Sequence, residues 1–435
     1  MNSTSAQTRT QSLRMTSVRW KIFFLLLTLV SINYIDRAAL SVAMPMISKE
    51  FELTPERQGL ILSSFFWTYL FMQMPSGMLA DRFKPRIIIA VATLGWGFFQ
   101  GLAAFCTGWF SLLLTRLGLG IAEGPIYPAG GKLNALWLTA NERTRGASLL
   151  DSGSALGSGL GAIIVAGLIT LLGSWRDAFL VAGVGTMLCG LWAWWYIRNA
   201  PREHPRIGEA EIAHIEEALA REDAAEPKVA SGVSFLRFFG YRSVWAMCLS
   251  HTCTNLIFFG LMTWLPTYLY KVHGFDIKAL GGATFIIFFF GFVGEVLAGQ
   301  IADRWRMSGA GANRVYRTMM VIGASCVALS MWAVAYVKSP FAVVSLLCAA
   351  LFFLRWCGGC NWATPSMLAT RARAGALTGI MNFVGNIAGI FVPIFIGFIV
   401  QTTGSYFLAL MFFVAVAGVQ ILCALSLNYQ KKLPV

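Results

Sequence analysis

The sequence predicts an all-α membrane protein in which twelve transmembrane helices form two pseudo-symmetric six-helix halves. Its composition points to a bilayer, because 57% of the 435 residues are hydrophobic and only 12% are charged, whereas soluble domains are about half apolar and about a quarter charged. The chain divides into twelve apolar segments, each near the roughly 20 residues that a membrane-spanning helix needs. It also repeats internally, since Asn33 and Asp81 have counterparts 222 residues later, at Asn255 and Asp303.

The predicted spans follow one another with short connections, apart from one long break in the middle. Their approximate bounds are residues 20–44, 58–80, 86–107, 109–131, 146–172, 177–198, 242–270, 279–302, 316–337, 340–367, 375–400 and 406–427. The first six spans form an N-terminal half over residues 20–198, and the last six form a C-terminal half over residues 242–427. Residues 199–241 form a predicted cytoplasmic linker, and predicted cytoplasmic tails occupy residues 1–19 and 428–435.

The orientation follows from the positions of the basic residues. Lys and Arg gather in alternate connections, such as residues 81–86, 132–145 and 303–317, whereas the connection at residues 49–57 is net negative. By the positive-inside rule, the basic connections and both tails lie in the cytoplasm. The same distribution accounts for the net charge of +14 and leaves no basic stripe for nucleic acid. The first apolar run is too long for the core of a signal peptide, so we expect an uncleaved first span.

The predicted linker carries an amphipathic segment over residues 207–223. Ile212, Ile215 and Leu219 share one face of it, and glutamates surround that face. This pattern predicts a cytoplasmic helix between the halves, with a partner-binding helix as the alternative. The nine cysteines are scattered, and the pair Cys357 and Cys360 has no second pair, so we expect reduced packing residues and neither a metal nor a cofactor.

A glycine-acid-base motif ends the second span. Gly77 precedes Asp81, Arg82 and Arg86 in the spacing G-x-x-x-D-R-x-K-x-R. Glycine permits close helix approach, and a carboxylate is stabilised by the N-terminus of a neighbouring helix. The motif therefore predicts a gating role, in which this loop latches one conformation of the protein.

The motif recurs in a more degenerate form at the end of the eighth span. Gly299 precedes Asp303 and Arg304 at the same spacing, which predicts an equivalent gating contact in the second half. The motif resembles the loop signature of the major facilitator superfamily. This resemblance implies a transporter whose substrate site lies between the halves near the membrane midplane.

Seven charged residues lie well inside predicted spans, where an unpaired charge costs at least a few kcal/mol. They are Asp36, Arg37, Arg116, Glu123, Asp151, Glu295 and Arg355. Adjacent helix residues point about 100° apart, so Asp36 and Arg37 face different neighbours. Asp36 and Arg116 have similar predicted depths, about 20 Å from the cytoplasmic end. We therefore predict an Asp36–Arg116 pair, with Glu123 and Arg37 completing the network. A static structural network is the alternative.

The buried acids suit proton coupling. A substrate anion that competes for a neighbouring arginine favours protonation of Asp36 or Glu123. Arg37 is the predicted anion ligand, because its planar guanidinium matches the geometry of a carboxylate.

Longer stretches resemble one branch of the superfamily, the anion:cation symporter family, and within it the bacterial transporters of galactonate, glucarate/galactarate and related hydroxy acids. The stretches are Asn33–Tyr34–Ile35–Asp36–Arg37, Phe66–Trp67–Thr68–Tyr69 with Gln73-x-Pro75-x-Gly77, Arg116-x-x-x-Gly120-x-x-Glu123-x-Pro125, Glu142–Arg143, Ser174–Trp175–Arg176 and His204–Pro205–Arg206. The resemblance implies proton coupling at Asp36 and Glu123, to which the depth argument adds Arg116. It implies substrate contacts at Tyr34, Arg37, Tyr69, Asn361, Trp362 and Asn382, with Asn386 one turn further on.

Two candidate substrate residues depart from the family pattern. Ser154 stands where a relative has a substrate-contacting Gln, and its side chain is shorter. Arg355 is not expected from the pattern; about two turns before Trp362, it is a candidate for a second carboxylate, which would favour a diacid. The alternatives are that Arg355 pairs with Glu295 or extends toward the membrane surface.

Three further features are interpreted as structural. Gly153, Gly157 and Gly161 form a stripe of small residues along the fifth span, which is typical of close helix packing. Asp151 lies about two turns into the same span and is interpreted as a structural acid. His251 in the seventh span is interpreted as a hydrogen-bonded packing residue.

Together these features predict a secondary active transporter of the bacterial cytoplasmic (inner) membrane. We expect a monomer in the lipid bilayer that imports a small organic anion, a sugar acid such as a hexonate or hexarate, in symport with protons by alternating access. The alternatives are transport of another carboxylate (an aromatic acid, a tartrate-like acid or a hexuronate) and, less favoured, drug export. A membrane enzyme is disfavoured, because the sequence has no metal-ligand cluster, nucleophile elbow or phosphate loop.

Overall fold

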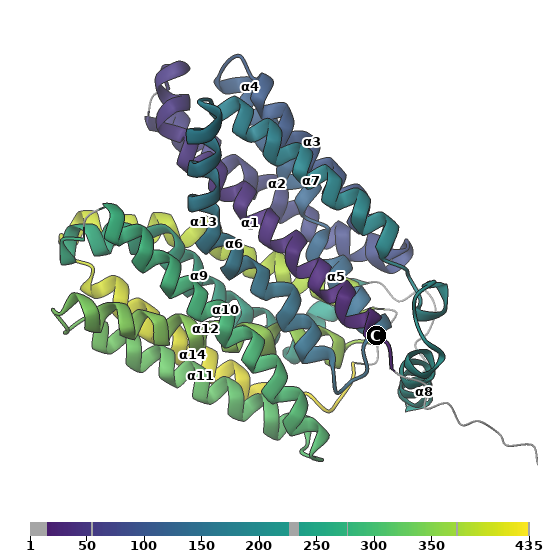
Figure 1. Ribbon diagram of the computed structural model, residues 1–435. Coiled ribbons are helices and arrows are strands. Elements are labelled where there is room, and N and C mark those ends of the chain that lie inside the picture. Colours follow the sequence, from purple (N-terminus) through teal and green to yellow (C-terminus); the bar gives the residue numbers. More distant parts are fainter. Residues whose placement is uncertain (1–14, 54, 226–234, 276, 371–372, 434–435) are drawn as a thin grey trace, which may run out of the picture.

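The computed structural model describes residues 15–53, 55–225, 235–275, 277–370 and 373–433. Within those residues all regular structure is helical, and the helices form two bundles that meet in a V shape (Figure 1). The first bundle consists of α1 (Val18–Glu50), α2 (Pro55–Arg82), α3 (Pro85–Leu102), α4 (Trp109–Glu123), α5 (Ile126–Trp137), α6 (Arg143–Leu172) and α7 (Trp175–Tyr196). The second consists of α9 (Arg242–His273), α10 (Ile277–Met307), α11 (Ala312–Val334), α12 (Pro340–Leu368), α13 (Ala374–Thr403) and α14 (Phe407–Ser426).

Most of these helices are apolar enough to cross a membrane. By length and composition, nine of the described helices qualify, and the bent pair Arg143–Gly161 and Ile163–Leu172 within α6 makes ten. The other two predicted spans correspond to α2 and to the α4–α5 pair. α2 contains the apolar stretch Leu60–Gln73 and also buries the polar side chains of Ser64, Gln73 and Ser76.

The fourth predicted span differs from the sequence prediction in its shape and length. It is broken between α4 and α5 at Gly124 and Pro125, and it continues to Trp137 rather than ending near residue 131. Proline has no backbone N–H and clashes with the preceding turn, so the α-helix is interrupted there. The next turn reforms at once, since the amide of Ala129 donates to the carbonyl of Pro125 at 3.0 Å.

A shorter helix, α8 (Glu209–Ala225), lies between the bundles in the sequence and beside one end of them in space (Figure 1). Its apolar residues Ile212, Ile215 and Leu219 are buried. The carboxylate of Glu211 accepts hydrogen bonds from the start of α1, including Arg19 Nη1 at 2.7 Å. These contacts tie α8 to the first bundle. The end of the molecule beside which α8 lies is called the α8 end.

The two bundles pack tightly against each other at the α8 end. A Cβ added at Gly77 of α2 would lie 2.6 Å from the carbonyl of Gly375 in α13, and one at Gly299 of α10 would lie 2.7 Å from Arg145 in α6. Contacts this close exclude any larger residue at these glycines. The amide of Arg145 also donates to the carboxylate of Asp303 at 2.9 Å.

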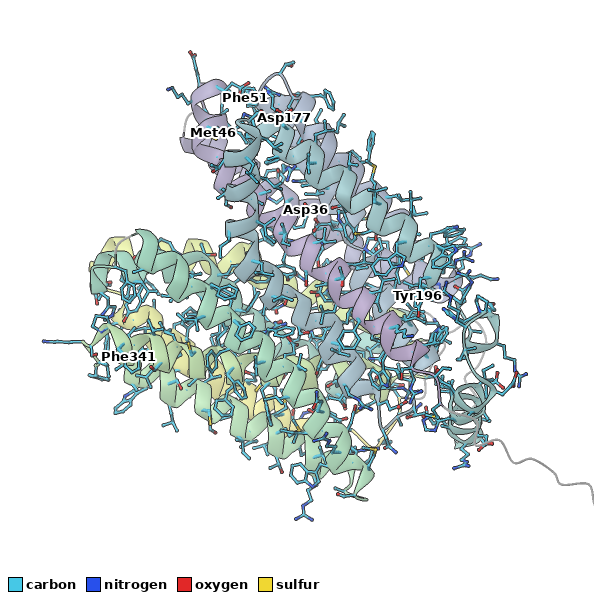
Figure 2. The ribbon with its side chains drawn as sticks, in the orientation of Figure 1. Asp36, Met46, Phe51, Asp177, Tyr196 and Phe341 are labelled. Atoms are coloured by element: carbon cyan, nitrogen blue, oxygen red, sulfur yellow. The ribbon has the colours of Figure 1, made fainter. Side chains whose placement is uncertain are left out.

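The bundles diverge toward the opposite end. Met46, Phe51 and Asp177 lie at the far tip of the first bundle, and Phe341 lies at the far tip of the second (Figure 2). At the tip of the first bundle an ion pair joins α1 to α7, since Arg176 Nη2 lies 2.5 Å from Glu50 Oε1. The hydrogen bonds from Arg176 and Trp175 hold the pKa of Glu50 below its usual value.

Candidate functional site

A cavity of about 560 Å³ lies between the bundles. Residues of α1, α2 and α4 line one side, and residues of α9 and α13 line the other. Its wall is mainly apolar and aromatic, with Phe65, Phe66 and Phe259, while Arg37 and Arg116 are its charged residues among those described. A largely apolar pocket with a few charged groups is the usual form of a small-molecule site.

Arg37 is held within an aromatic cradle at this cavity. Its guanidinium carbon lies 4.6 Å from the ring centres of Tyr34, Phe65 and Tyr69. Its Nε donates to Glu123 Oε2 at 3.0 Å, and Nη2 has no hydrogen-bond partner among the described residues. The aromatic faces fix the guanidinium plane by cation–π attraction, and the outer nitrogen remains available to a ligand.

Asp36 points away from Arg37, toward α7. The residue is 1% exposed, and its carboxylate accepts a hydrogen bond from Thr186 at 3.1 Å; Figure 2 marks its position within the first bundle. The predicted Asp36–Arg116 ion pair does not form; within the described chain, Arg116 instead donates to Gln100 of α3 at 3.1 Å. The prediction compared depths along the helices but not the directions in which the side chains point around them.

Glu123 lies at the centre of the charge network of the first bundle. It is fully buried, and besides its bond to Arg37 its second oxygen, Oε1, has no described hydrogen-bond partner. Both side-chain atoms of Asn33, one turn before Arg37 on α1, also lack described partners. With Asp36 and Arg116 the network contains two acids and two bases, so its formal charge is zero.

Arg355 belongs to a second network that joins the two bundles. Its Nη2 lies 2.6 Å from Glu295 of α10 and 2.5 Å from Asp151 of α6, across the boundary between the bundles. The same nitrogen lies 2.8 Å from Ser154 Oγ. The ion pair with Glu295 was one of the alternatives that the sequence left open. The contact with Asp151 was not predicted, because nothing in the sequence reveals which helices of the two halves adjoin.

Two candidate residues make contacts between the bundles, and a third adjoins one of them. Trp362 of α12 stacks on Tyr127 of α5, with ring centres 4.5 Å apart and planes 15° apart. Asn382 of α13 donates to Gln73 of α2 at 2.6 Å, and Asn386 in turn donates to Asn382 at the same distance. In this conformation these groups pair with one another or across the bundle contact, and none of the three lines the central cavity.

The remaining candidate amide and aromatic residues are less available. Asn361 is used within the second bundle, where it accepts from Ser250 at 2.9 Å and donates to Thr254 at 2.9 Å. Tyr34 and Tyr69 are buried around the guanidinium of Arg37.

The candidate gating residues lie at the α8 end. Arg82 and Arg304 are exposed, whereas Arg86 donates to the carbonyl of Trp194 at 2.8 Å and covers its ring. Asp303 contacts the other bundle through Arg145. The side chain of Asp81 lies outside the described part of the structure.

Several uncharged partners of these groups were not predicted from the sequence. Tyr127, Gln100 and Thr186 each contact a candidate residue. In the sequence they stand out only as uncharged polar side chains inside apolar spans. Such a side chain is a weaker indication of function than a charged one. No group of three or more His, Cys, Asp or Glu side chains arranged to hold a metal occurs in the part of the chain that the structure describes.

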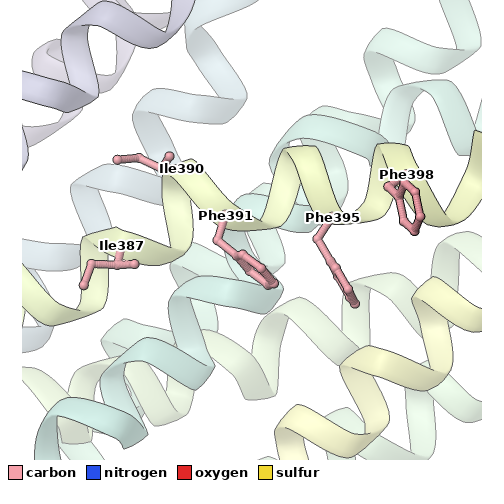
Figure 3. A pocket seen from close by; sticks show the side chains of 5 residues that line it. All are labelled: Ile387, Ile390, Phe391, Phe395 and Phe398. Atoms are coloured by element: carbon pink, nitrogen blue, oxygen red, sulfur yellow. The ribbon is translucent and has the colours of Figure 1, made fainter.

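A second hollow, of about 460 Å³, lies on the surface of α13. Ile387, Ile390, Phe391, Phe395 and Phe398 line it, and all are hydrocarbon side chains of one helix (Figure 3). It offers nothing to orient a polar ligand, so it is not the candidate site. It adjoins the central cavity at Ile390, which lines both.

Comparisons with known proteins agree with this architecture. The model of the Major Facilitator Superfamily matches residues 26–393. A solved structure of the proton:xylose symporter XylE, bound to 6-bromo-6-deoxy-D-glucose, has a similar fold, with a TM-score of 0.76 over 95% of each chain at 15% sequence identity.

Curated relatives are similar over nearly the whole chain. The probable galactarate/D-glucarate transporter of Bacillus subtilis (strain 168) is 31% identical over 427 residues, covering 95% of this chain and 92% of that protein. The probable L-galactonate transporter of Escherichia coli (strain K12) is 30% identical over 404 residues, covering 92% and 87% respectively. These relatives are transporters rather than enzymes.

Proposed function

This chain belongs to the major facilitator superfamily, and on that premise we propose that it imports a sugar acid together with protons by alternating access. The substrate is a hexonate or hexarate, and it binds in the central cavity between the two bundles. The proposal includes the orientation predicted from the basic loops: the α8 end faces the cytoplasm of a bacterial cell, and the V opens outward.

The position of Arg37 carries the proposal. It lines the cavity, aromatic rings on several sides orient it, and one of its nitrogens is without a partner among the described residues. A guanidinium held in this way binds a carboxylate strongly and with a defined orientation. The positive charge of Arg37 repels a cationic ligand, so its position in the cavity disfavours the rival function, export of cationic drugs.

Groups suited to a polyol lie around Arg37 and at the contact between the bundles. Tyr34 and Tyr69 adjoin Arg37, and Trp362, Asn382 and Asn386 lie at the contact with the second bundle. Hydroxyl, amide and indole groups can hydrogen-bond sugar hydroxyls while Arg37 holds the acid end. The similar proteins named for galactarate, D-glucarate and L-galactonate transport support this class of substrate.

Proton coupling follows from the shared use of Arg37. Glu123 is fully buried and has Arg37 as its ion-pair partner. A substrate carboxylate that takes over Arg37 leaves Glu123 as an uncompensated buried anion, which is strongly unfavourable. A proton on Glu123 removes that cost, and Asp36 with Arg116 forms the adjoining part of the same network. Substrate binding and proton binding thereby favour each other.

Protons also supply the driving force. An inside-negative potential opposes entry of an anion by about 2.3 kcal/mol per charge per 100 mV. More than one proton for each negative charge reverses this opposition and makes uptake favourable.

A second carboxylate of a hexarate would bind Arg355. In this conformation Arg355 forms ion pairs with Asp151 and Glu295. The second carboxylate of the substrate therefore displaces one of these two acids. A hexonate has no such group and leaves that network intact.

A thermal-shift screen of the purified protein tests the substrate class. We expect hexonates and hexarates to raise the unfolding temperature in a concentration-dependent way, because a ligand that binds only the folded state stabilises it. Hexuronates, aromatic acids and lipophilic cations serve as comparison ligands. A shift with only the lipophilic cations, and none with any sugar acid, would contradict the proposal and support a drug exporter.

A further inference from the structure

The network of Asp151, Arg355 and Glu295 contains one carboxylate more than its single guanidinium can neutralise. All three side chains are nearly fully buried, with exposures of 4%, 3% and 0%. The two acidic oxygens lie 2.5 and 2.6 Å from the same nitrogen, so they are at most 5.1 Å apart. Two carboxylates this close in an apolar interior do not both remain ionised.

Acceptor oxygens are crowded around one nitrogen of Arg355. Four oxygens lie within 3.0 Å of Arg355 Nη2: the carbonyl and carboxylate of Asp151, the hydroxyl of Ser154 and the carboxylate of Glu295. That nitrogen carries two hydrogens. Because a guanidinium nitrogen only donates, the four oxygens share these two hydrogens. A proton held between the carboxyl groups of Asp151 and Glu295 relieves the repulsion among the oxygens gathered there.

Among the described residues, Asp151 and Glu295 form ion pairs with Arg355 and with no other base. Other described titratable groups within electrostatic range lie on α1, α5, α9 and α12 and include Tyr34, Tyr127, His251 and Cys360. Phenol and thiol groups are uncharged near neutral pH. The described contacts of His251 are to Asn255 and to the ring of Trp362, and no ion pair joins its imidazole to Asp151 or Glu295.

We propose that Asp151, Arg355 and Glu295 form a second proton-carrying site, separate from Asp36 and Glu123, whose proton is bound when the bundles meet at the α8 end and released when they part. The proposal rests on the proposed alternating-access function for the parting of the bundles. The proton is shared by the carboxyl groups of Asp151 and Glu295.

The division of the network between the bundles produces the coupling. Asp151 is on α6 of the first bundle, whereas Glu295 and Arg355 are on α10 and α12 of the second. When the bundles separate there, Glu295 and Arg355 remain together as a balanced ion pair. Asp151 enters water, where a carboxylic acid ionises near neutral pH. One proton is therefore released on the α8 side in each cycle.

The direction of the pH effect follows directly. The joined state binds one proton more than the parted state, so lower pH favours the joined state and higher pH favours the parted state. A difference of one proton changes the ratio of the two states by up to about tenfold per pH unit.

Two measurements on the substrate-free, full-length protein test this site. Infrared spectroscopy should detect a protonated carboxyl band near neutral pH that is lost in Glu295→Gln. Hydrogen–deuterium exchange, after correction for intrinsic rates, should show that the start of α6 is up to tenfold better protected per unit of lower pH. This dependence should weaken in Glu295→Gln, which is left with the neutral Asp151–Arg355 pair.

Two further substitutions show whether the band and the pH dependence come from this network. Asp151→Asn removes the surplus charge from the other side and should lose the same band, while exposed Asp177→Asn should behave like the wild type. A band and a pH dependence that persist unchanged in both Glu295→Gln and Asp151→Asn would overturn the proposal, as would a wild type without any protonated carboxyl band. Neither the infrared band nor the exchange measurement involves substrate. A failure to transport sugar acids would therefore not affect either readout, and a failure of either readout would not affect the transport result.

Discussion

Two adjacent residues of α1 have different surroundings because successive helix positions point about 100° apart. Arg37 faces the cavity and contacts Glu123, whereas Asp36 faces α7 and accepts a hydrogen bond from Thr186. In the proposed mechanism, Arg37 binds the substrate carboxylate and the two acids carry protons. The guanidinium of Arg37 is thus the group that binds the substrate. Its exchange of Glu123 for the substrate carboxylate is the coupling step.

Arg37→Lys should weaken substrate binding by roughly 10- to 100-fold, which corresponds to about 1.5–3 kcal/mol for one charge-assisted hydrogen bond. Lysine keeps the charge but cannot form the paired contacts of a guanidinium or stack its plane between the rings. Isothermal titration calorimetry with the sugar acid that stabilises the protein most measures the change. Arg221→Lys on the exposed face of α8 is the matched control. Equal affinity in Arg37→Lys and in the wild type would remove Arg37 from the site.

At this scale the sequence revealed which charges are buried but not how they pair. Asp36, Arg116, Glu123, Asp151, Glu295 and Arg355 are all buried, as expected for charges inside apolar spans. Their pairing depends on how each helix is rotated about its axis and on which helices adjoin across the two bundles. Neither quantity is encoded in the spacing of residues along one helix, which is why the Asp36–Arg116 pair was predicted wrongly.

At the scale of the helices, the glycine stripe of α6 brings α1 close enough to position Tyr34 and Arg37. A Cβ at Gly153 would lie 2.5 Å from the carbonyl of Leu27, and one at Gly157 would clash with the carbonyl of Ser31 and approach Tyr34. The stripe was predicted to be a packing face, and the contacts show which helix packs on it. Small residues let backbones approach in membranes, where packing rather than hydrophobicity drives helix association.

Gly157→Val should destabilise the protein by about 1–3 kcal/mol, because the added atoms force the two backbones apart. The midpoint of thermal unfolding in detergent should fall. Gly167→Val is the matched control on the same helix, since nothing described lies within 4 Å of the Cβ position at Gly167. Similar losses in both variants would mean that valine itself, rather than the α1 contact, is harmful.

The boundaries of helices were predictable where Gly and Pro punctuate the chain. The break at Gly124 and Pro125 follows from the chemistry of proline, yet the apolar pattern continues across it, so a single span was expected. The second span was predicted over residues 58–80, and the helix α2 runs from Pro55 to Arg82.

At the scale of the whole molecule, the two bundles are joined at the α8 end and apart at the other. The glycine contacts of α2 with α13 and of α6 with α10 close that end, and Asp303 adds a polar contact to Arg145. The twelve-helix, two-half architecture was predicted from composition and the internal repeat, and the family match and the XylE-like fold confirm it. Which end is closed depends on contacts between residues far apart in sequence, and it was not predicted.

Asp303→Ala should loosen the α8 end. The substitution leaves the backbone amide of Arg145 without its acceptor, which costs about 1–3 kcal/mol if that amide stays buried. Backbone hydrogen exchange should become faster at the start of α6 and at the end of α10. Glu217→Ala on exposed α8 is the control, and exchange rates that match the wild type in both variants would contradict a gating role for Asp303.

Uptake into proteoliposomes tests the central claim most directly. With an inwardly directed proton gradient, the wild-type protein should accumulate galactarate or galactonate above its external concentration, and a protonophore should abolish the accumulation. Asp36→Asn and Glu123→Gln should each bind substrate but fail to accumulate it, because each removes a proton-carrying group. Accumulation that resists the protonophore, or that both variants match, would contradict proton-coupled sugar-acid import.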